Sequence, residues 1–225
     1  MSRGFVLAAW AAFFAYLWFT GEMARYLGPR TYWVVPFGAL TLAAAAVVHG
    51  LTIRAGHRTA RPARSDVAGL AALLLPIVAV ATIPSADLGA LAASRKSISG
   101  VGAAAAISPP EPKPGHAPSF IDIHYANESA DYAAAVGIVD GIELELTGFV
   151  SQETSSGTFE LARFYVSCCA ADAIPYSVLV SFEDGSYELN RWLRVRGTVA
   201  ETPDGFLLQA DSIDPVEPPD DPYLY

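Results

Sequence analysis

The chain has 225 residues, of which 52% are hydrophobic and 16% are charged, and its formal net charge is −9. Residues 1–110 carry nine Lys/Arg and three Asp/Glu, a net charge of +6, whereas residues 111–225 carry five Lys/Arg and twenty Asp/Glu, a net charge of −15. This division indicates a basic, apolar membrane anchor joined to an acidic, water-exposed domain. The acidic domain excludes nucleic acid as a partner, because binding a polyanion requires a basic surface.

Three apolar segments with almost no charge occupy residues 4–20, 32–53 and 67–84. At about 1.5 Å per residue, helices of these lengths reach roughly 25–33 Å, which matches a hydrocarbon layer about 30 Å thick. The sequence therefore predicts three transmembrane α-helices in an anchor that spans residues 1–86.

The arginines predict how this anchor is oriented. The loop between the second and third segments, "RAGHRTARPARSD", holds four arginines, so we expect it to be cytoplasmic. With three spans, the N-terminus is then cytoplasmic, and the C-terminal domain is extracytoplasmic at the plasma (inner) membrane.

Residues 87–119 have few large side chains and end in a proline-rich stretch, "PPEPKP" at 109–114. Such a stretch cannot hold a helix and favours an extended spacer, so we predict a linker. A short interfacial helix within "DLGALAASRKS", residues 87–97, is an alternative for the first part of this linker.

Residues 120–225 are enough for one small core. The stretch "FIDIHYANESADYAAAV", residues 120–136, has apolar residues at helical spacing and predicts one short helix. Five later stretches, from "IELELTGFVSQ" to "GFLLQADSID", are rich in β-branched and aromatic residues and predict strands. We expect an all-β domain, a small five-stranded OB-like barrel, in which Gly148 and Gly197 mark bulges or sharp bends.

The chain has two cysteines, and they are adjacent, within "RFYVSCCAADAIP" at residues 163–175. If the chain leaves the second strand in a helical turn, Cys168, Cys169 and Asp172 share one face, because residues three and four apart are neighbours. Two thiolates and a carboxylate suit zinc, and a histidine such as His124 or His116 would complete four-coordination.

Two other interpretations of this segment stay open. The cysteines could form a vicinal disulfide, which would persist outside the cell but would close a strained eight-membered ring. In a purely structural interpretation, Cys168 fills the core, Cys169 is a partly buried thiol, and Asp172 caps the turn through backbone N–H groups.

Four stretches together resemble the YcgQ-like family of bacterial membrane proteins, whose soluble domain has no known function. They are "GFV" at 148–150, "RFYVSCCAADAIP" at 163–175, "WLRVRGTV" at 192–199 and "PPDDPYLY" at 218–225. The resemblance implies a small partner of a two-component permease, beside a larger multi-spanning protein, with a link to zinc-responsive regulation in some members. It marks Cys168, Cys169 and Asp172 as motif positions, whereas His124 as a zinc ligand rests on ligand counting alone.

The sequence contains none of the G-x-S-x-G, H-E-x-x-H or phosphate-binding glycine motifs of common enzymes, so we do not expect an enzyme. We expect a membrane-anchored accessory subunit of a transport system, whose extracytoplasmic barrel presents or senses zinc. The alternatives are a purely structural subunit and an extracytoplasmic thiol redox protein, the latter being the one enzymatic candidate.

Overall fold

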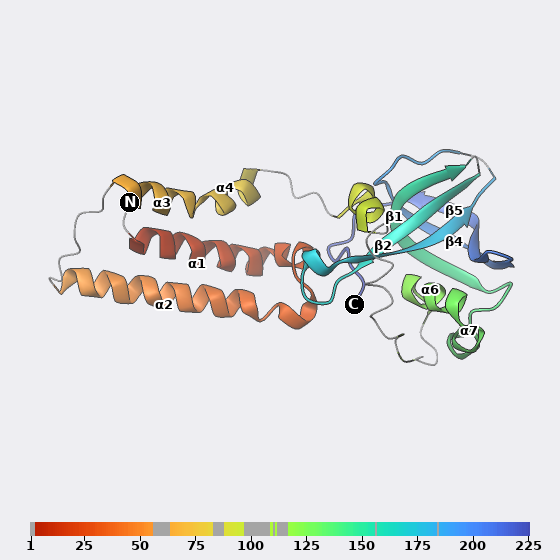
Figure 1. Cartoon of the computed structure of the whole chain (residues 1–225), viewed down its shortest axis with the longest axis horizontal. Coiled ribbons are helices and arrows are strands. Elements are labelled where there is room, and N and C mark those ends of the chain that lie inside the picture. Colours follow the sequence, from red (N-terminus) through yellow and green to blue (C-terminus); the bar gives the residue numbers. More distant parts are fainter. Residues whose placement is uncertain are drawn as a thin grey trace. The chain divides into compact units, whose positions relative to one another are not determined.

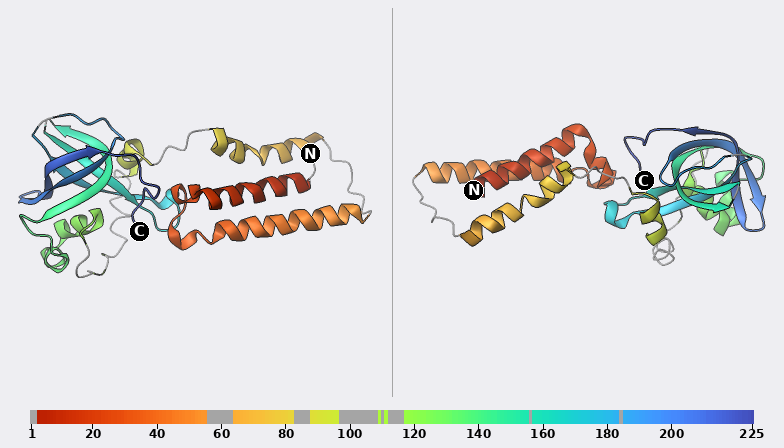
Figure 2. Two further views of the ribbon diagram at one scale, coloured as in Figure 1. Left: turned by 180° about the vertical axis from the view of Figure 1, so that it is seen from behind. Right: turned by 90° about the horizontal axis from the view of Figure 1, so that it is seen from above.

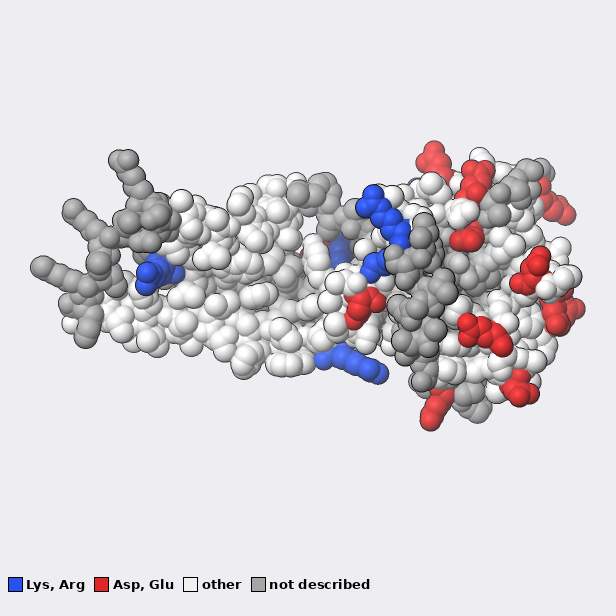
Figure 3. Space-filling model, in the orientation of Figure 1, with Lys and Arg blue, Asp and Glu red and all other residues white. Residues whose placement is uncertain are grey.

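The computed structural model describes residues 3–55, 64–82, 88–96, 109, 111, 117–155, 157–183 and 185–225. The chain forms two compact units, a helical unit, Met1–Ala86, and a barrel unit, Asp87–Tyr225 (Figure 1). On the face that Figure 3 shows, Lys, Arg, Asp and Glu side chains are sparse among the described residues of the helical unit, whereas Asp and Glu are scattered over the barrel unit. This contrast agrees with the division of charge in the sequence.

The helical unit contains two long helices, α1 (Arg3–Thr20) and α2 (Val34–Arg54), joined through the short 3-10 helices η1 (Glu22–Arg25) and η2 (Pro29–Thr31). Large apolar side chains point outward from both, and Phe19 and Leu40 are 85% and 72% exposed. Among the described residues, two helices are long and apolar enough to cross a membrane, Arg3–Thr20 and Pro29–Arg54. They correspond to the first two predicted spans.

The third predicted span is not one continuous helix. Residues 64–82 form α3 (Arg64–Ala72) and α4 (Leu75–Thr82), separated by a turn at Leu73 and Leu74. Pro76 explains the break, because it has no N–H to donate to the Ala72 carbonyl and its ring clashes there. The Trp10 indole donates a hydrogen bond to the Leu73 carbonyl at 3.0 Å, which satisfies one backbone group at the break. The prediction of an uninterrupted third span is therefore wrong over residues 67–82, the part of 67–84 that the structure describes.

Among the described residues of the barrel unit, five strands close into a barrel (Figure 2). They are β1 (Glu143–Ser155), β2 (Thr158–Tyr165), β3 (Ile174–Ser181), β4 (Trp192–Thr202) and β5 (Gly205–Pro215). Their order around the barrel is β1-β2-β3-β5-β4. Neighbouring strands are antiparallel except β3 and β5, which pair in parallel at Val180–Leu208 and Ser181–Gln209. The predicted five-stranded barrel is confirmed.

The segment before the barrel forms two helices, α6 (Phe120–Glu128) and α7 (Ala130–Val136), where we predicted one. Ser129 separates them, because its backbone is extended and its hydroxyl accepts a hydrogen bond from the Tyr132 N–H at 3.3 Å. Ser129 is thus the N-cap of a new helix, a role that serine favours over a position inside a helix. Phe120 and Ile123 of α6 are buried in the main core.

The two predicted glycine positions differ in what they do. At Gly197 the pairing of β4 with β5 shifts register, and the Gln209 carbonyl leaves no room for a side chain. This confirms a bulge. At Gly148 a Cβ atom would lie 2.6 Å from the Ala162 carbonyl oxygen, so the glycine permits a close approach of β1 to β2. The register of β1 against β2 shifts further along, after Val150.

The barrel wall is apolar on both faces at one end. Leu144, Leu146 and Val150 of β1 belong to the main core, whereas Phe149, of opposite parity, lies in a second cluster. Since side chains alternate across a strand, this second cluster lies on the outer face of the wall. We call it the outer cluster, and its buried members are Ala93, Phe149, Ala162, Phe164, Val166, Ala173, Trp192 and Tyr223.

A helix at residues 90–96, here called the docked helix, covers part of the outer cluster. Ala90 and Ala93 are each 5% exposed, and the Ala90 N–H donates to the Asn190 side-chain oxygen at 2.7 Å. Residues 90–96 thus form a helix in the segment for which an interfacial helix was the alternative to a linker, and this helix packs within the barrel unit. The compact barrel unit, Asp87–Tyr225, thus includes a helix that precedes Phe120, where we expected the domain to start.

We predict that a fragment of residues 87–225 is more stable than a fragment of residues 120–225, because the shorter one exposes the outer cluster. The loss should be about 2 kcal/mol or more, the scale for exposing one or two large apolar side chains. Urea denaturation followed by tryptophan fluorescence measures this, since Trp192 is the one tryptophan of both fragments. Equal midpoints and equal emission maxima would contradict the packing of the docked helix on the barrel.

Candidate metal centre

The cysteines lie in a short excursion of the chain, residues 167–172, here called the corner. The residues on either side, Val166 and Ala173, are 1% and 3% exposed and belong to the outer cluster. Between them the chain leaves β2, makes the 3-10 turn η3 (Ala170–Asp172) and enters β3. The residues on either side of the corner are therefore fixed by packing against the barrel, whereas the corner itself lies outside this packing.

The C-terminal tail holds the end of β2 beside the corner. The Val166 N–H donates to the Leu224 carbonyl at 3.1 Å, and the Leu224 N–H donates to the Phe164 carbonyl at 2.7 Å. The Arg163 guanidinium donates to the carbonyls of Asp221 and Pro222 at 2.7 and 3.1 Å. The tail thus continues the sheet as a short parallel bridge.

Asp172 organises the corner from within. Its carboxylate accepts hydrogen bonds from the backbone N–H groups of Ser167 at 3.1 Å and of Cys168 at 2.8 Å. Burial raises the pKa of Asp172, but hydrogen bonds donated by the Cys168 thiol and by these N–H groups outweigh it, so the pKa is lower than usual. A helical turn is present but is shorter than predicted, since η3 begins at Ala170 and Cys169 before it is extended. Asp172 accepts hydrogen bonds from backbone N–H groups, as the structural interpretation expected, but these groups precede the turn.

Both thiols are accessible, since Cys168 is exposed, Cys169 is half-buried and neither is in a disulfide. The expectation that Cys168 fills the core in the structural interpretation is therefore wrong. The hydrogen bond to the Asp172 carboxylate, with a further contribution from Cys169, raises the pKa of Cys168 to about 12. In this conformation Cys168 carries a proton at neutral pH.

The three candidate ligands are close enough to share one metal ion. One ligand atom from each of Cys168, Cys169 and Asp172 lies within 4.8 Å of the others, and the two Sγ atoms are 3.6 Å apart. Two sulfurs on one tetrahedral zinc ion lie about 3.8 Å apart when each Zn–S bond is about 2.3 Å. A disulfide requires about 2.05 Å. The donor set and the sulfur spacing fit zinc.

His124 is not part of this group. It lies on α6, where its ring packs edge-on against the rings of Tyr125 and Tyr176, and Nε2 lies 3.5 Å from a Glu128 carboxylate oxygen. The structure therefore does not bring the predicted histidine ligand to the cysteines. His116 lies outside the described residues.

Lys96, at the end of the docked helix, contacts the corner from the side. Its ammonium donates to the carbonyls of Ala170 at 3.4 Å, Ala171 at 2.9 Å and Ala173 at 2.9 Å. The sequence carried no signal for this contact, because Lys96 lies in a segment predicted to be a linker and its acceptors are backbone atoms.

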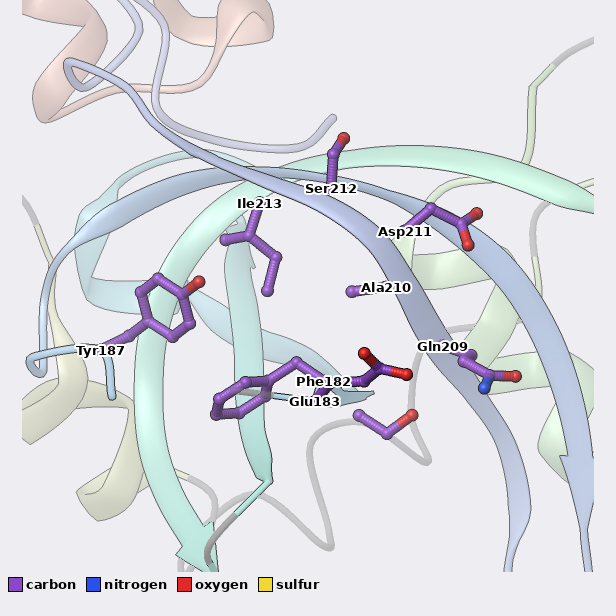
Figure 4. Close-up of a pocket in the computed structure, with 9 residues that line it drawn as sticks. Phe182, Glu183, Tyr187, Gln209, Ala210, Asp211, Ser212 and Ile213 are labelled. Atoms are coloured by element: carbon purple, nitrogen blue, oxygen red, sulfur yellow. The ribbon is translucent and has the colours of Figure 1, made fainter. Parts of the chain in front are cut away.

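A separate hollow of about 520 Å³ opens where β3 and β5 stop pairing (Figure 4). The rings of Phe182 and Tyr187 lie along it, with Ile213 opposite, and Glu183 and Asp211 add carboxylates. It shares no residue with the corner. Sequence analysis did not mark it, because its lining comes from a strand edge and a loop that meet only in the fold.

Residues 122–225 match the family model described as DUF1980 C-terminal domain. This supports the expectation of a domain of unknown function at this end of the chain, and the finer resemblance to the YcgQ-like family stays a prediction. No curated protein matches the chain.

We predict that Asp172→Asn speeds the alkylation of Cys168 at pH 8 by about threefold or more. The carboxylate raises the pKa of this thiol, so its loss increases the thiolate fraction about tenfold per pKa unit. The lower nucleophilicity of the less basic thiolate offsets about 40–50% of this gain on a logarithmic scale, which leaves about threefold per pKa unit. Mass spectrometry after timed iodoacetamide treatment gives the rate. Asp211→Asn, which removes a carboxylate from the hollow, should leave the rate unchanged. An unchanged rate in Asp172→Asn would contradict the hydrogen bond between the two side chains.

Proposed function

We propose that this chain is a membrane-anchored accessory subunit of a transport system, and that its barrel unit presents or senses zinc at the corner. The observation that carries the proposal is the approach of Cys168, Cys169 and Asp172 to one another on an accessible part of the surface. Two thiolates and a carboxylate are a borderline-soft donor set that suits zinc.

An incomplete ligand set favours transient binding over a structural role. Structural zinc sites have four protein ligands, whereas sites that exchange a ligand keep one position open. Among the described residues the corner supplies three side chains, and in this proposal His116, which lies outside those residues, or a donor from a partner takes the fourth position. The backbone hydrogen bonds to Asp172 would orient this carboxylate, as partners of metal ligands commonly do.

The anchor in this proposal has three spans, the third made of α3 and α4 together. A broken helix is tolerated in a bilayer where neighbouring protein satisfies the freed backbone groups, and the bond from Trp10 to Leu73 is of this kind. The arginine-rich loop before α3 orients the barrel unit to the extracytoplasmic side of the inner membrane. The exposed apolar faces of α1 and α2 suit contact with lipid and with a larger multi-spanning permease.

The barrel itself supports a binding role by its topology. The order β1-β2-β3-β5-β4 with parallel closure between β3 and β5 supports the OB-like assignment, a fold that commonly presents ligand sites. A redox role is the second candidate, favoured by two vicinal thiols that are accessible and 3.6 Å apart. Oxidation to a disulfide would prevent zinc binding, so the two functions exclude each other in one molecule.

We predict that the purified full-length chain in mild detergent, reduced and free of chelator, binds about one zinc ion. Cys168→Ser and Cys169→Ser should abolish zinc binding or weaken it at least about tenfold, because each variant lacks one of the three proposed ligands. His124→Ala should bind as the parent does, because His124 lies outside the group. Isothermal titration with zinc gives the stoichiometry and the affinities.

Loss of binding in His124→Ala alone would show that the histidine and not the corner holds the metal. Equal binding by the parent and both cysteine variants would reject the corner as the site. A parent that binds no zinc and whose mass is two units lower before reductant is added would favour the redox role.

A further inference from the structure

The docked helix is held at both of its ends by hydrogen bonds to the rest of the barrel unit. At its start, the Ala90 N–H donates to Asn190, and at its end Lys96 donates to three carbonyls of the chain around η3. Between these bonds, Ala93 is buried in the outer cluster, which also contains Ala173. Lys96 therefore links the helix to the corner by hydrogen bonds, and the helix packs in the same cluster as Ala173, which follows the corner.

The acceptors of Lys96 alternate with the candidate metal ligands along the chain. Ala170 and Ala171 follow Cys169, and Ala173 follows Asp172. An ammonium has three N–H donors, and three carbonyls accept from this one at 2.9–3.4 Å. A change in the backbone of the turn would move the ligands and the acceptors together. The docked position of Lys96 thus favours the turn geometry in which the two sulfurs lie 3.6 Å apart.

Charge favours the same coupling. A zinc ion bound by two thiolates and one carboxylate has a formal net charge of −1, and the Lys96 ammonium lies on the same turn. The attraction between opposite charges stabilises the loaded corner and the docked helix in the presence of each other. Binding and docking then support one another, and by linkage each must affect the other by the same factor.

We propose that a metal ion at Cys168, Cys169 and Asp172 tightens the docking of residues 90–96 on the barrel, so that occupancy of the corner restrains the segment that joins the barrel to the anchor. In sequence, residues 83–89 alone separate α4 from the docked helix. In this proposal the corner senses zinc, and binding of zinc reduces the mobility of residues 90–96 on the barrel. The inference rests on the proposed function of the corner.

Hydrogen exchange and zinc binding of the full-length chain in detergent test this. The variants are Lys96→Met, which removes the ammonium, and Asn190→Gly, which releases the other end of the helix without touching the corner. Glycine suits this position because Asn190 has a φ of 68°. Arg194→Met, which removes a cation from the barrel wall while Arg196 stays beside Glu145, is the control.

Zinc should slow amide exchange in residues 88–96 of the parent and of Arg194→Met. Lys96→Met and Asn190→Gly should each speed this exchange, weaken zinc binding by about tenfold, and alter the alkylation rate of Cys169 in the absence of metal. If only Lys96→Met weakens binding, the ammonium acts by its charge alone and the coupling through docking is rejected.

The absence of metal binding would not leave the coupling undecided. If the parent takes up no zinc, the proposed function fails, and the alkylation of Cys169 decides the coupling. A changed rate in both Lys96→Met and Asn190→Gly supports a link between helix and corner. Faster exchange in residues 88–96 with an unchanged alkylation rate would show that they are independent, and would overturn the inference.

Discussion

The barrel unit depends on covering the apolar patch on the outside of its own wall. Phe149, Phe164 and Trp192 point away from the barrel interior, and the ring centroids of Phe149 lie 5.6 Å from Phe164 and 5.8 Å from Trp192. Aromatic groups of this size are unfavourable in water, so other parts of the chain must cover them. The docked helix and the C-terminal tail cover them. The corner connects β2 to β3 beside these two segments.

This arrangement explains why separate parts of the sequence meet at one place. The stretches around Phe149, Phe164, Trp192 and Tyr223 are those on which the resemblance to a membrane-protein family rests, and each contributes to the outer cluster. They build the support of the corner, which in turn holds Cys168, Cys169 and Asp172 together. A patch that packs a strand end, a helix and a tail against one another provides a fixed base for an accessible turn.

Much of the fold could be predicted from the sequence, because it follows from local periodicity. The first two apolar helices, the five strands and the turn at Asp172 are of this kind. The break at Pro76 and the second helix after Ser129 do not follow from periodicity, because each depends on one residue, a proline without an N–H and a serine that caps a helix. A helix within residues 87–97 was one of the alternatives, but its docking on the barrel could not be predicted, since Ala90 and Ala93 are small and acquire their role only from the aromatic side chains that they cover. Within the candidate site, the spacing predicted that Cys168, Cys169 and Asp172 lie close together, although hydrogen bonds to the Asp172 carboxylate, and not one helical face, bring Cys168 near it. His124 did not join them, because counting missing ligands says nothing about distance in space, and Lys96 binds to carbonyls that every residue has.

X-ray absorption at the zinc edge of the reduced, zinc-loaded full-length chain tests the central claim most directly, because it reports the atoms bound to the metal. The account predicts two sulfur scatterers at about 2.3 Å together with oxygen or nitrogen at about 2.0–2.1 Å, and one sulfur fewer in Cys169→Ser. A first shell of oxygen and nitrogen alone would contradict it, since the corner could not then be the site at which zinc is held.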